Sequence, residues 1–158
     1  MSLEEVGDDE ILYRRFQIGH YKTCQLTGNK VISSQAFSDK TRQVSVDRAK
    51  INQHNPDRTK FLVTDGVVEL ITREVRGISN ISKNDGKGNP LQLQTLVVTP
   101  DPIKDDPELP DNPAHALISS TPDYNNRAVF NKVIEALALI AAVKIPPTNP
   151  LQPTVTTN

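Results

Sequence analysis

The stretch from Pro100 to Pro113 constrains the fold more than any other part of this chain. It combines prolines with acidic residues: Pro100, Pro102, Pro107, Pro110 and Pro113 with Asp101, Asp105, Asp106, Glu108 and Asp111. Because proline has a fixed φ and no backbone N–H, such a stretch can form neither a helix nor a central strand. We therefore expect an exposed, fairly stiff connector. A partner-binding or cation-binding loop is the alternative, although prolines stand where a calcium loop turns on a glycine.

Strand-like segments lie on both sides of this connector. Leu91–Val98 alternates and then becomes continuously apolar, which is typical of a strand that runs from an edge into a core. Ala114–Ser119 returns as a second strand. Earlier in the chain, Ile11–Ile18 and Val44–Asp47 also have the composition or alternation of strands.

The segment from Val67 to Ile78 supports two interpretations. Its apolar residues follow a helical spacing, at positions 67, 68, 71, 75 and 78. The run Val67–Ile71 is instead rich in residues that favour strands. A short strand that passes into one helical turn, with Thr72 as the N-cap, would satisfy both signals. Of the two interpretations we favour a helix.

The clearest helix prediction covers about residues 122–144. Thr121 is suited to be its N-cap and Pro122 its first helical residue. One apolar stripe comprises Phe130, Ile134, Leu137 and Ala141. The second half is apolar almost all round, so it is either buried between elements or part of an oligomer interface, and we favour burial. The pair Pro146-Pro147 ends the helix.

Together these elements predict one α+β domain over residues 10–145. Its sheet has four to six strands, mixed or mostly antiparallel, and is packed by the long C-terminal helix. Residues 1–9 are expected to be a flexible start, and residues 146–158 a disordered tail rich in proline and threonine. With 158 residues, of which 36% are apolar, the chain can bury one modest core.

The composition argues against several classes of protein. A formal net charge of −1 gives no electrostatic footprint for nucleic acid. The single cysteine, Cys24, excludes an internal disulfide and a thiolate-rich metal site. The longest apolar run, Ala136–Val143, is much shorter than the roughly 18 residues of a membrane-spanning helix, and the acidic start is unlike a signal peptide. We expect a cytoplasmic protein with no cofactor, no metal, and no contact with membranes or nucleic acid.

His115 is the histidine most suited to chemistry, because it alone lies directly beside an apolar run. A neutral imidazole at that position can act as a general base or as a metal ligand. More often such a histidine donates one N–H to a backbone carbonyl and fixes a loop, and we favour that structural role. Nothing in the spacing of His20, Cys24 and His54 predicts a zinc site.

Three further residues are weaker catalytic candidates beside His115. They are Arg15 (or its neighbour Arg14), Ser34 and Ser45. Neither serine lies in a Gly-x-Ser-x-Gly motif, so a hydrolase is not predicted.

A resemblance rests on four short segments. They are Leu12-Tyr13-Arg14-Arg15, Ser34-Gln35-Ala36-Phe37-Ser38, Val44-Ser45-Val46 and Asn112-Pro113-Ala114-His115-Ala116. Over about residues 11–120, this series resembles a pattern of small, uncharacterised bacterial proteins and implies no particular activity. An early arginine followed by serine-containing strands is also similar to ADP-ribosyltransferase-like domains, where such residues help to hold NAD. Those domains also have a carboxylate at the site, for which Asp47 and Glu69 are the candidates here.

Two functional hypotheses follow. The first is a non-enzymatic interaction or accessory module of a bacterial cytoplasm, which meets a protein partner or a second copy through the apolar end of its last helix. It predicts an exposed apolar patch near Leu137, Leu139 and Ile140. The alternative is a nucleotide- or NAD-handling enzyme, and its cleft would be formed by Arg15, Ser34, Ser45 and His115. It predicts that these four side chains converge in one concave pocket.

Overall fold

The protein is a single α+β domain, as the sequence predicts. The computed structural model describes residues 4–79, 81–84, 90–93, 95–121 and 127–149. Six antiparallel strands form the main sheet in the order β10 (Ala142–Ile145), β5 (Gly66–Ile71), β1 (Ile11–Phe16), β4 (Val44–Arg48), β9 (His115–Thr121) and β8 (Thr95–Pro100). Two hairpins extend from it, β2 (Tyr21–Thr23) with β3 (Lys30–Ile32) and β6 (Ser82–Asn84) with β7 (Pro90–Leu93).

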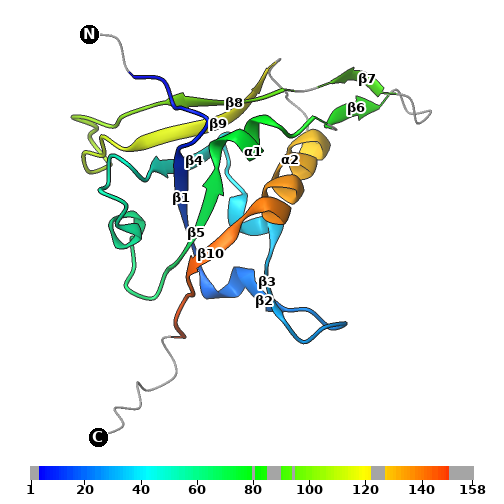
Figure 1. Ribbon diagram of the computed structural model, residues 1–158, viewed down its shortest axis with the longest axis horizontal. Helices are drawn as coiled ribbons and strands as arrows, with labels where there is room; N and C mark the ends of the chain where they lie inside the picture. Colours follow the sequence, from blue (N-terminus) through cyan, green and yellow to red (C-terminus); the bar gives the residue numbers. More distant parts are fainter. Residues whose placement is uncertain (1–3, 80, 85–89, 94, 122–126, 150–158) are drawn as a thin grey trace, which may run out of the picture.

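The helices among the described residues are α1 (Thr72–Arg76), α2 (Arg127–Ile140) and three short 3₁₀ helices, η1 (Ile18–His20), η2 (Ser34–Phe37) and η3 (Pro56–Thr59). The sheet is strongly coiled. Strands β5 and β8 are separated by three others in the sheet, yet α1, which directly follows β5, contacts β8. In Figure 1, β1 and β5 accordingly run steeply down the molecule, whereas β8 and β9 run across it. Twist in one direction accumulates from strand to strand and produces this curvature.

The two faces of the sheet bury different sets of residues, because side chains alternate along each strand. On one face, Leu12 and Phe16 of β1 and Val44 and Val46 of β4 join α2 in the main core. On the opposite face lies a smaller cluster of Tyr13, Ala49 and Val67. That opposite face also receives Ser45 and Asp47, which alternate with the two valines of β4.

Helix α2 packs its predicted apolar stripe against the core. Its buried residues are Val129, Phe130, Val133, Ile134 and Leu137. Leu137 is completely buried, whereas Leu139 is 87% exposed, so the expected burial holds for only one side of the second half of the helix. The expected patch of three exposed residues is therefore wrong for Leu137, and Ile140 is only partly buried.

The predicted end of the long helix is wrong. The helix ends at Ile140, and residues 142–145 form the edge strand β10 against β5 rather than a last helical turn. Val143 and Ile145 are β-branched and can pair with the open edge of β5, which stabilises them more than a further turn would. The expected start of this helix, residues 122–126, lies outside the described residues.

Two other boundaries also differ from the sequence prediction. The favoured helix over residues 67–78 is wrong, because residues 66–71 form a strand between β1 and β10, and only Thr72–Arg76 is helical. Ile71, and not Thr72, is the N-cap, while the Thr72 hydroxyl donates to the Glu10 carbonyl (2.9 Å). The pairing of β5 with a neighbour on each side overrides the weak helical periodicity of residues 67–78. Separately, the expected strand Leu91–Val98 is divided between β7 and β8.

Both ends of the described chain lie against the domain. Val6 is only 2% exposed, and Arg48 donates to the carbonyls of Glu4 and Glu5. Near the other end, the Thr148 N–H donates to the Thr64 carbonyl (3.0 Å). The remainder of the expected tail, residues 150–158, lies outside the described residues.

Candidate ligand-binding cavity

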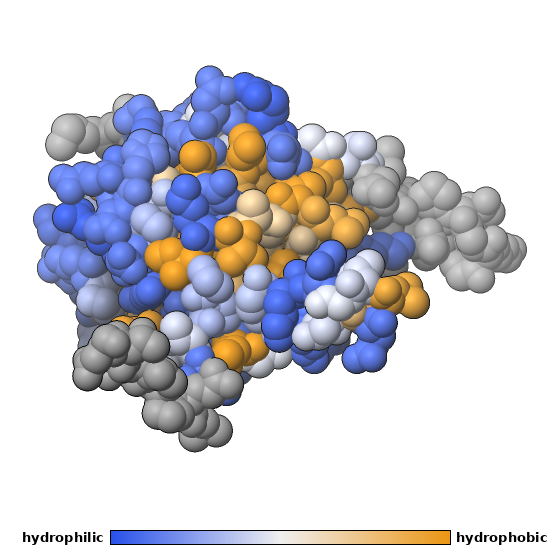
Figure 2. All heavy atoms as spheres, turned by 60° about the horizontal axis from the view of Figure 1, so that its bottom comes forward, coloured by the Kyte–Doolittle hydropathy of each residue, from blue (hydrophilic) through white to orange (hydrophobic). Residues whose placement is uncertain are grey.

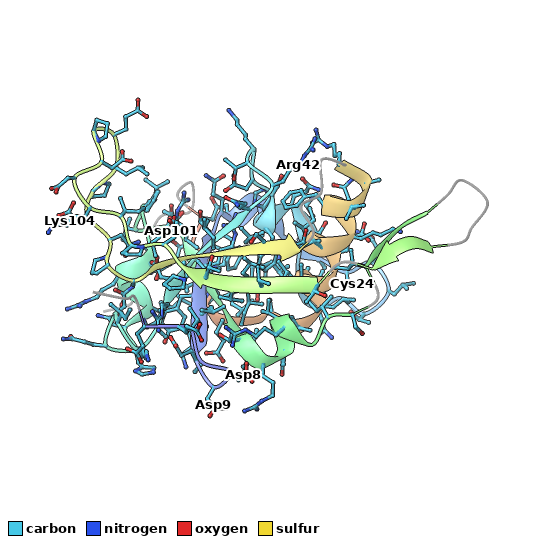
Figure 3. The ribbon with its side chains drawn as sticks, turned by 90° about the horizontal axis from the view of Figure 1, so that it is seen from above. Asp8, Asp9, Cys24, Arg42, Asp101 and Lys104 are labelled. Carbon is cyan, nitrogen blue, oxygen red and sulfur yellow. The ribbon has the colours of Figure 1, made fainter. Side chains whose placement is uncertain are left out.

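A cavity of about 450 Å³ lies on the sheet face opposite α2 and extends round the strand ends to η2. Its walls come from β1, β4 and β9, from η2, from the segment that follows η3, and from the loop between β8 and β9. Figure 3 shows this last loop, with Asp101 and Lys104, beyond one end of β8 and β9, whereas Cys24 and Arg42 lie well away from it.

The cavity opens where β1 and β4 diverge. Strand β1 pairs with β5 over all six of its residues, from Ile11 to Phe16. With β4 it pairs only at Leu12 and Tyr13. Because β1 stays with β5, its last residues leave β4, and a gap forms between two neighbouring strands.

The Arg14 guanidinium spans this gap. Its Nε donates to the Ala36 carbonyl (2.8 Å), Nη1 to the Ser45 carbonyl (2.8 Å) and Nη2 to the Ser38 carbonyl (3.3 Å). These contacts use three of the five guanidinium N–H groups. Desolvation lowers the pKa of Arg14 to about 10, so the side chain remains positively charged at neutral pH.

Arg15 supplies a second guanidinium on the opposite face of the same strand. Its Cζ lies 3.6 Å from the centre of the Phe61 ring, a cation–π contact. Phe61 is 68% exposed, so much of this aromatic surface remains accessible. Within the described part of the chain, neither Arg14 nor Arg15 forms an ion pair with a carboxylate.

The two carboxylates in the wall are already engaged. Asp47 is buried, and its two oxygens accept from the Thr59 hydroxyl (2.9 Å) and the Asn112 amide (2.8 Å). Asp39 accepts at Oδ1 from the N–H and the hydroxyl of Thr41. Asp47 therefore ties both loops that frame the cavity to β4, and Asp39 closes its own turn.

His115 lines the cavity beside Asp47, which is its partner in the pairing of β4 with β9. Its Nδ1 lies 2.8 Å from the carbonyl oxygen of Asp101 and 3.1 Å from the carboxylate Oδ2 of the same residue. A proton on Nδ1 can be donated to that carbonyl, which leaves Nε2 as a hydrogen-bond acceptor. This contact to a backbone carbonyl is the one expected of a histidine that fixes a loop.

His20 is a further titratable group in the wall. Burial lowers its pKa, and the positive charges of Lys22 and Arg14 lower it further. The imidazole is therefore neutral at neutral pH. The positive charge of the cavity wall comes from the two arginines.

The structure brings together three of the four predicted site residues. Arg15, Ser45 and His115 line the cavity, and so does Arg14. Ser34, the first residue of η2, does not line the cavity, although the next two residues, Gln35 and Ala36, do. Of the two proposed carboxylates, Asp47 lines the cavity and Glu69 does not.

Sequence reasoning missed the wall residues that lie outside strands. Phe61 is the main one: the apolar run Phe61-Leu62-Val63 would normally be core, yet Leu62 and Val63 are 56% and 86% exposed. Asp65 fixes this run, since its Oδ2 accepts from the N–H groups of Phe61 (3.0 Å) and Leu62 (2.9 Å). The turn signal Asp65-Gly66 was the one available hint that a loop, rather than a strand, precedes β5.

Other reactive or charged groups do not contribute to this cavity. Cys24 lies in the turn between β2 and β3, where the hydroxyl and N–H of Thr27 and the N–H of Leu26 lower its pKa. A second hollow, of about 430 Å³, is lined by the acidic N-terminal segment. Two of its carboxylates are neutralised, Glu10 by Arg48 and Glu4 by Lys50. Across the described residues there is no group of three or more side chains that could hold a metal ion.

Comparisons with protein-family models, with curated proteins and with solved structures gave no match. The resemblances drawn from the sequence therefore stay predictions. As far as the described residues extend, no helix is long and apolar enough to cross a membrane.

Proposed function

We propose that the protein is a non-enzymatic accessory module that binds a small anionic molecule in the cavity between β1 and β4. One observation carries this proposal: two guanidinium groups, Arg14 and Arg15, line one cavity, and neither forms an ion pair with a described carboxylate. Arginine in this situation presents N–H groups that suit a carboxylate or a phosphate. The cavity volume lies within the range of small-molecule sites.

The state of Asp47 supports binding rather than catalysis. General acid–base catalysis needs a group within reach of the substrate that can exchange a proton. Both oxygens of Asp47 accept hydrogen bonds from the protein, so this carboxylate holds the walls in place. Nδ1 of His115 faces Asp101, and its Nε2 stays available as an acceptor, which is the group that a catalytic function would need.

A nucleotide- or NAD-handling enzyme is the second candidate. One observation favours it, namely that Arg15, Ser45 and His115 share the cavity. Ser34 lies outside the wall, and Asp47, the carboxylate nearest to these groups in the sheet pairing, is engaged by Thr59 and Asn112. For these reasons we place binding ahead of catalysis.

A protein partner at the last helix also remains a proposal. Leu139 is exposed on α2 and Val143 is partly exposed on β10. Figure 2 shows a face on which apolar residues gather near the centre while hydrophilic residues occupy its left side. This arrangement does not identify a partner molecule that would bind to these residues, so the functional proposal is based on the cavity.

Thermal unfolding in the presence of hexanoate or inorganic phosphate tests the proposal, with ionic strength held constant. A ligand at 100 times its dissociation constant stabilises the native state by about 2.7 kcal/mol. For a domain of this size, that corresponds to a rise in Tm of about 5–11 °C. Arg15→Gln should abolish this rise. Arg58→Gln, which alters an exposed arginine on η3 outside the cavity, should retain it.

Arg15 is preferred to Arg14 for this test, because Arg14 also holds η2 to β4 through three carbonyls. Equal ligand-induced shifts in the two variants would contradict the proposal, since the anion would then bind elsewhere. A rise in Tm with NAD but with neither hexanoate nor phosphate, lost in Arg15→Gln, would favour the nucleotide-handling enzyme.

A further inference from the structure

We infer that the ligand of this cavity is amphipathic, with its anionic end at Arg14 and Arg15 and an apolar body against the loop between β8 and β9. This inference rests on the proposed function and specifies the class of ligand. The proline-rich loop contributes apolar side chains to the cavity: Ile103, Leu109 and Pro110 line it, and Leu109 is 47% exposed.

Hydrogen bonds within the loop hold the backbone of these apolar residues in place. Ile103 and Asn112 exchange two backbone hydrogen bonds (2.9 and 2.8 Å), which closes the loop at its base. Nearer the tip, Asp106 Oδ1 accepts from the N–H groups of Glu108 (2.8 Å) and Leu109 (3.0 Å). The backbone on which Leu109 stands is therefore fixed before binding, which reduces the entropy lost when a ligand arrives.

Three of the five acidic side chains of the loop, those of Asp101, Asp106 and Asp111, are used for this internal bonding. Besides Asp106, Asp111 accepts from the Asp105 N–H (3.0 Å), and the Asp101 carboxylate lies 3.1 Å from Nδ1 of His115. None of the five loop carboxylates lines the cavity, whereas the apolar Ile103, Leu109 and Pro110 do, together with Asn112. A cation-binding role is therefore less well supported than an apolar contact.

The cationic and apolar ends of the cavity are separated along β4. Arg14 is bound to the Ser45 carbonyl, and Asn112, at the base of the loop, is bound to the Asp47 carboxylate. Residues two apart on a strand are separated by about 6–7 Å. A two-carbon acid such as acetate cannot reach both ends, whereas a longer carboxylate can.

Titration calorimetry with acetate, butanoate, hexanoate and octanoate at constant ionic strength tests this inference. Each methylene that enters an apolar environment contributes up to about 4-fold in affinity. We expect the dissociation constant to fall by about 2- to 4-fold for each methylene that contacts the loop. Leu109→Ser should weaken octanoate binding at least about 5-fold and leave inorganic phosphate binding unchanged.

The matched control is Leu139→Ser, which makes the same change at an exposed position on α2 outside the cavity. It should bind the whole series as the native protein does, and circular dichroism should show both variants folded. Affinity that does not change with chain length, or an equal effect of Leu109→Ser and Leu139→Ser, would overturn the inference. Binding that still depended on Arg15 would then leave the proposed function intact. If none of the anions binds, the proposed function itself fails.

Discussion

Replacing Glu10 by alanine should destabilise the protein by about 3–5 kcal/mol, because it leaves the Arg48 guanidinium buried without its counter-ion. The side chains of Arg48 and Glu10 are only 4% and 8% exposed. They form a bidentate pair, in which Nε donates to Oε1 (2.9 Å) and Nη2 to Oε2 (2.8 Å). After the substitution, Arg48 would keep only the neutral backbone carbonyls of Glu4 and Glu5 as partners.

Thermal and urea unfolding at pH 7 measure this loss. For a domain of this size, about 3–5 kcal/mol corresponds to a fall in Tm of about 6–20 °C. The control is Glu74→Ala on α1, which removes an exposed carboxylate and should change stability by less than about 0.5 kcal/mol. A loss for Glu10→Ala of under about 1 kcal/mol would refute the reasoning, because the N-terminal segment would then not bury this pair.

The same pair should make stability depend on pH in a defined direction. Burial alone raises the pKa of Glu10, but hydrogen bonds from Arg48 and from the Gly7 N–H outweigh burial, and the net pKa lies below the ordinary 4.5. The unfolded chain therefore binds the proton first as pH falls. The contribution of the pair is complete above that ordinary value and is lost as pH falls through the lower folded value. The stability difference between the native protein and Glu10→Gln should accordingly be constant near neutral pH and shrink in acid; a difference that grows in acid would contradict this linkage.

Two further substitutions probe the core. Leu137→Ala should cost about 2–5 kcal/mol in urea unfolding, because this side chain is completely buried, whereas Leu139→Ala at 87% exposure should cost less than about 0.5 kcal/mol; similar losses would show that α2 is not packed on this face. Gly66→Ala would place a Cβ 2.6 Å from the buried Phe16 ring and should cost about 1–3 kcal/mol, while Gly19→Ala meets no atom within 4 Å and serves as its control. An unchanged Tm for Gly66→Ala would mean that the Phe16 ring does not lie against Gly66.

Local sequence patterns were sufficient to predict much of the fold. Alternation of apolar and polar residues over Val44–Asp47 predicted strand β4, and it also determined that Ser45 and Asp47 share the face away from α2. The apolar stripe that includes Leu137 predicted the buried face of α2. These predictions depend only on the spacing of apolar residues within one segment, which repeats every 2 residues in a strand and about every 3.6 in a helix.

Where a local pattern was compatible with two structures, the tertiary environment decided between them. Residues 142–145 are as apolar as the helix before them, and they became a strand because β5 offered an open edge. The run Phe61-Leu62-Val63 has the composition of a core strand, and it lies exposed because Asp65 fixes it in a turn. Burial and edge pairing involve distant residues, so no window of sequence contains them.

The sequence by itself determined an α+β chain with one amphipathic C-terminal helix, and it singled out Arg15, Ser34, Ser45 and His115 as candidate site residues. Only the tertiary structure decided that Arg15, Ser45 and His115 share a cavity and that Ser34 does not line it. The cavity exists because β1 follows β5 and leaves β4, and because Arg14 reaches carbonyls 22 to 31 positions away in the chain. Strand divergence of this kind depends on the pairing of the whole sheet, so it cannot be predicted from the alternation of apolar and polar residues in a single strand.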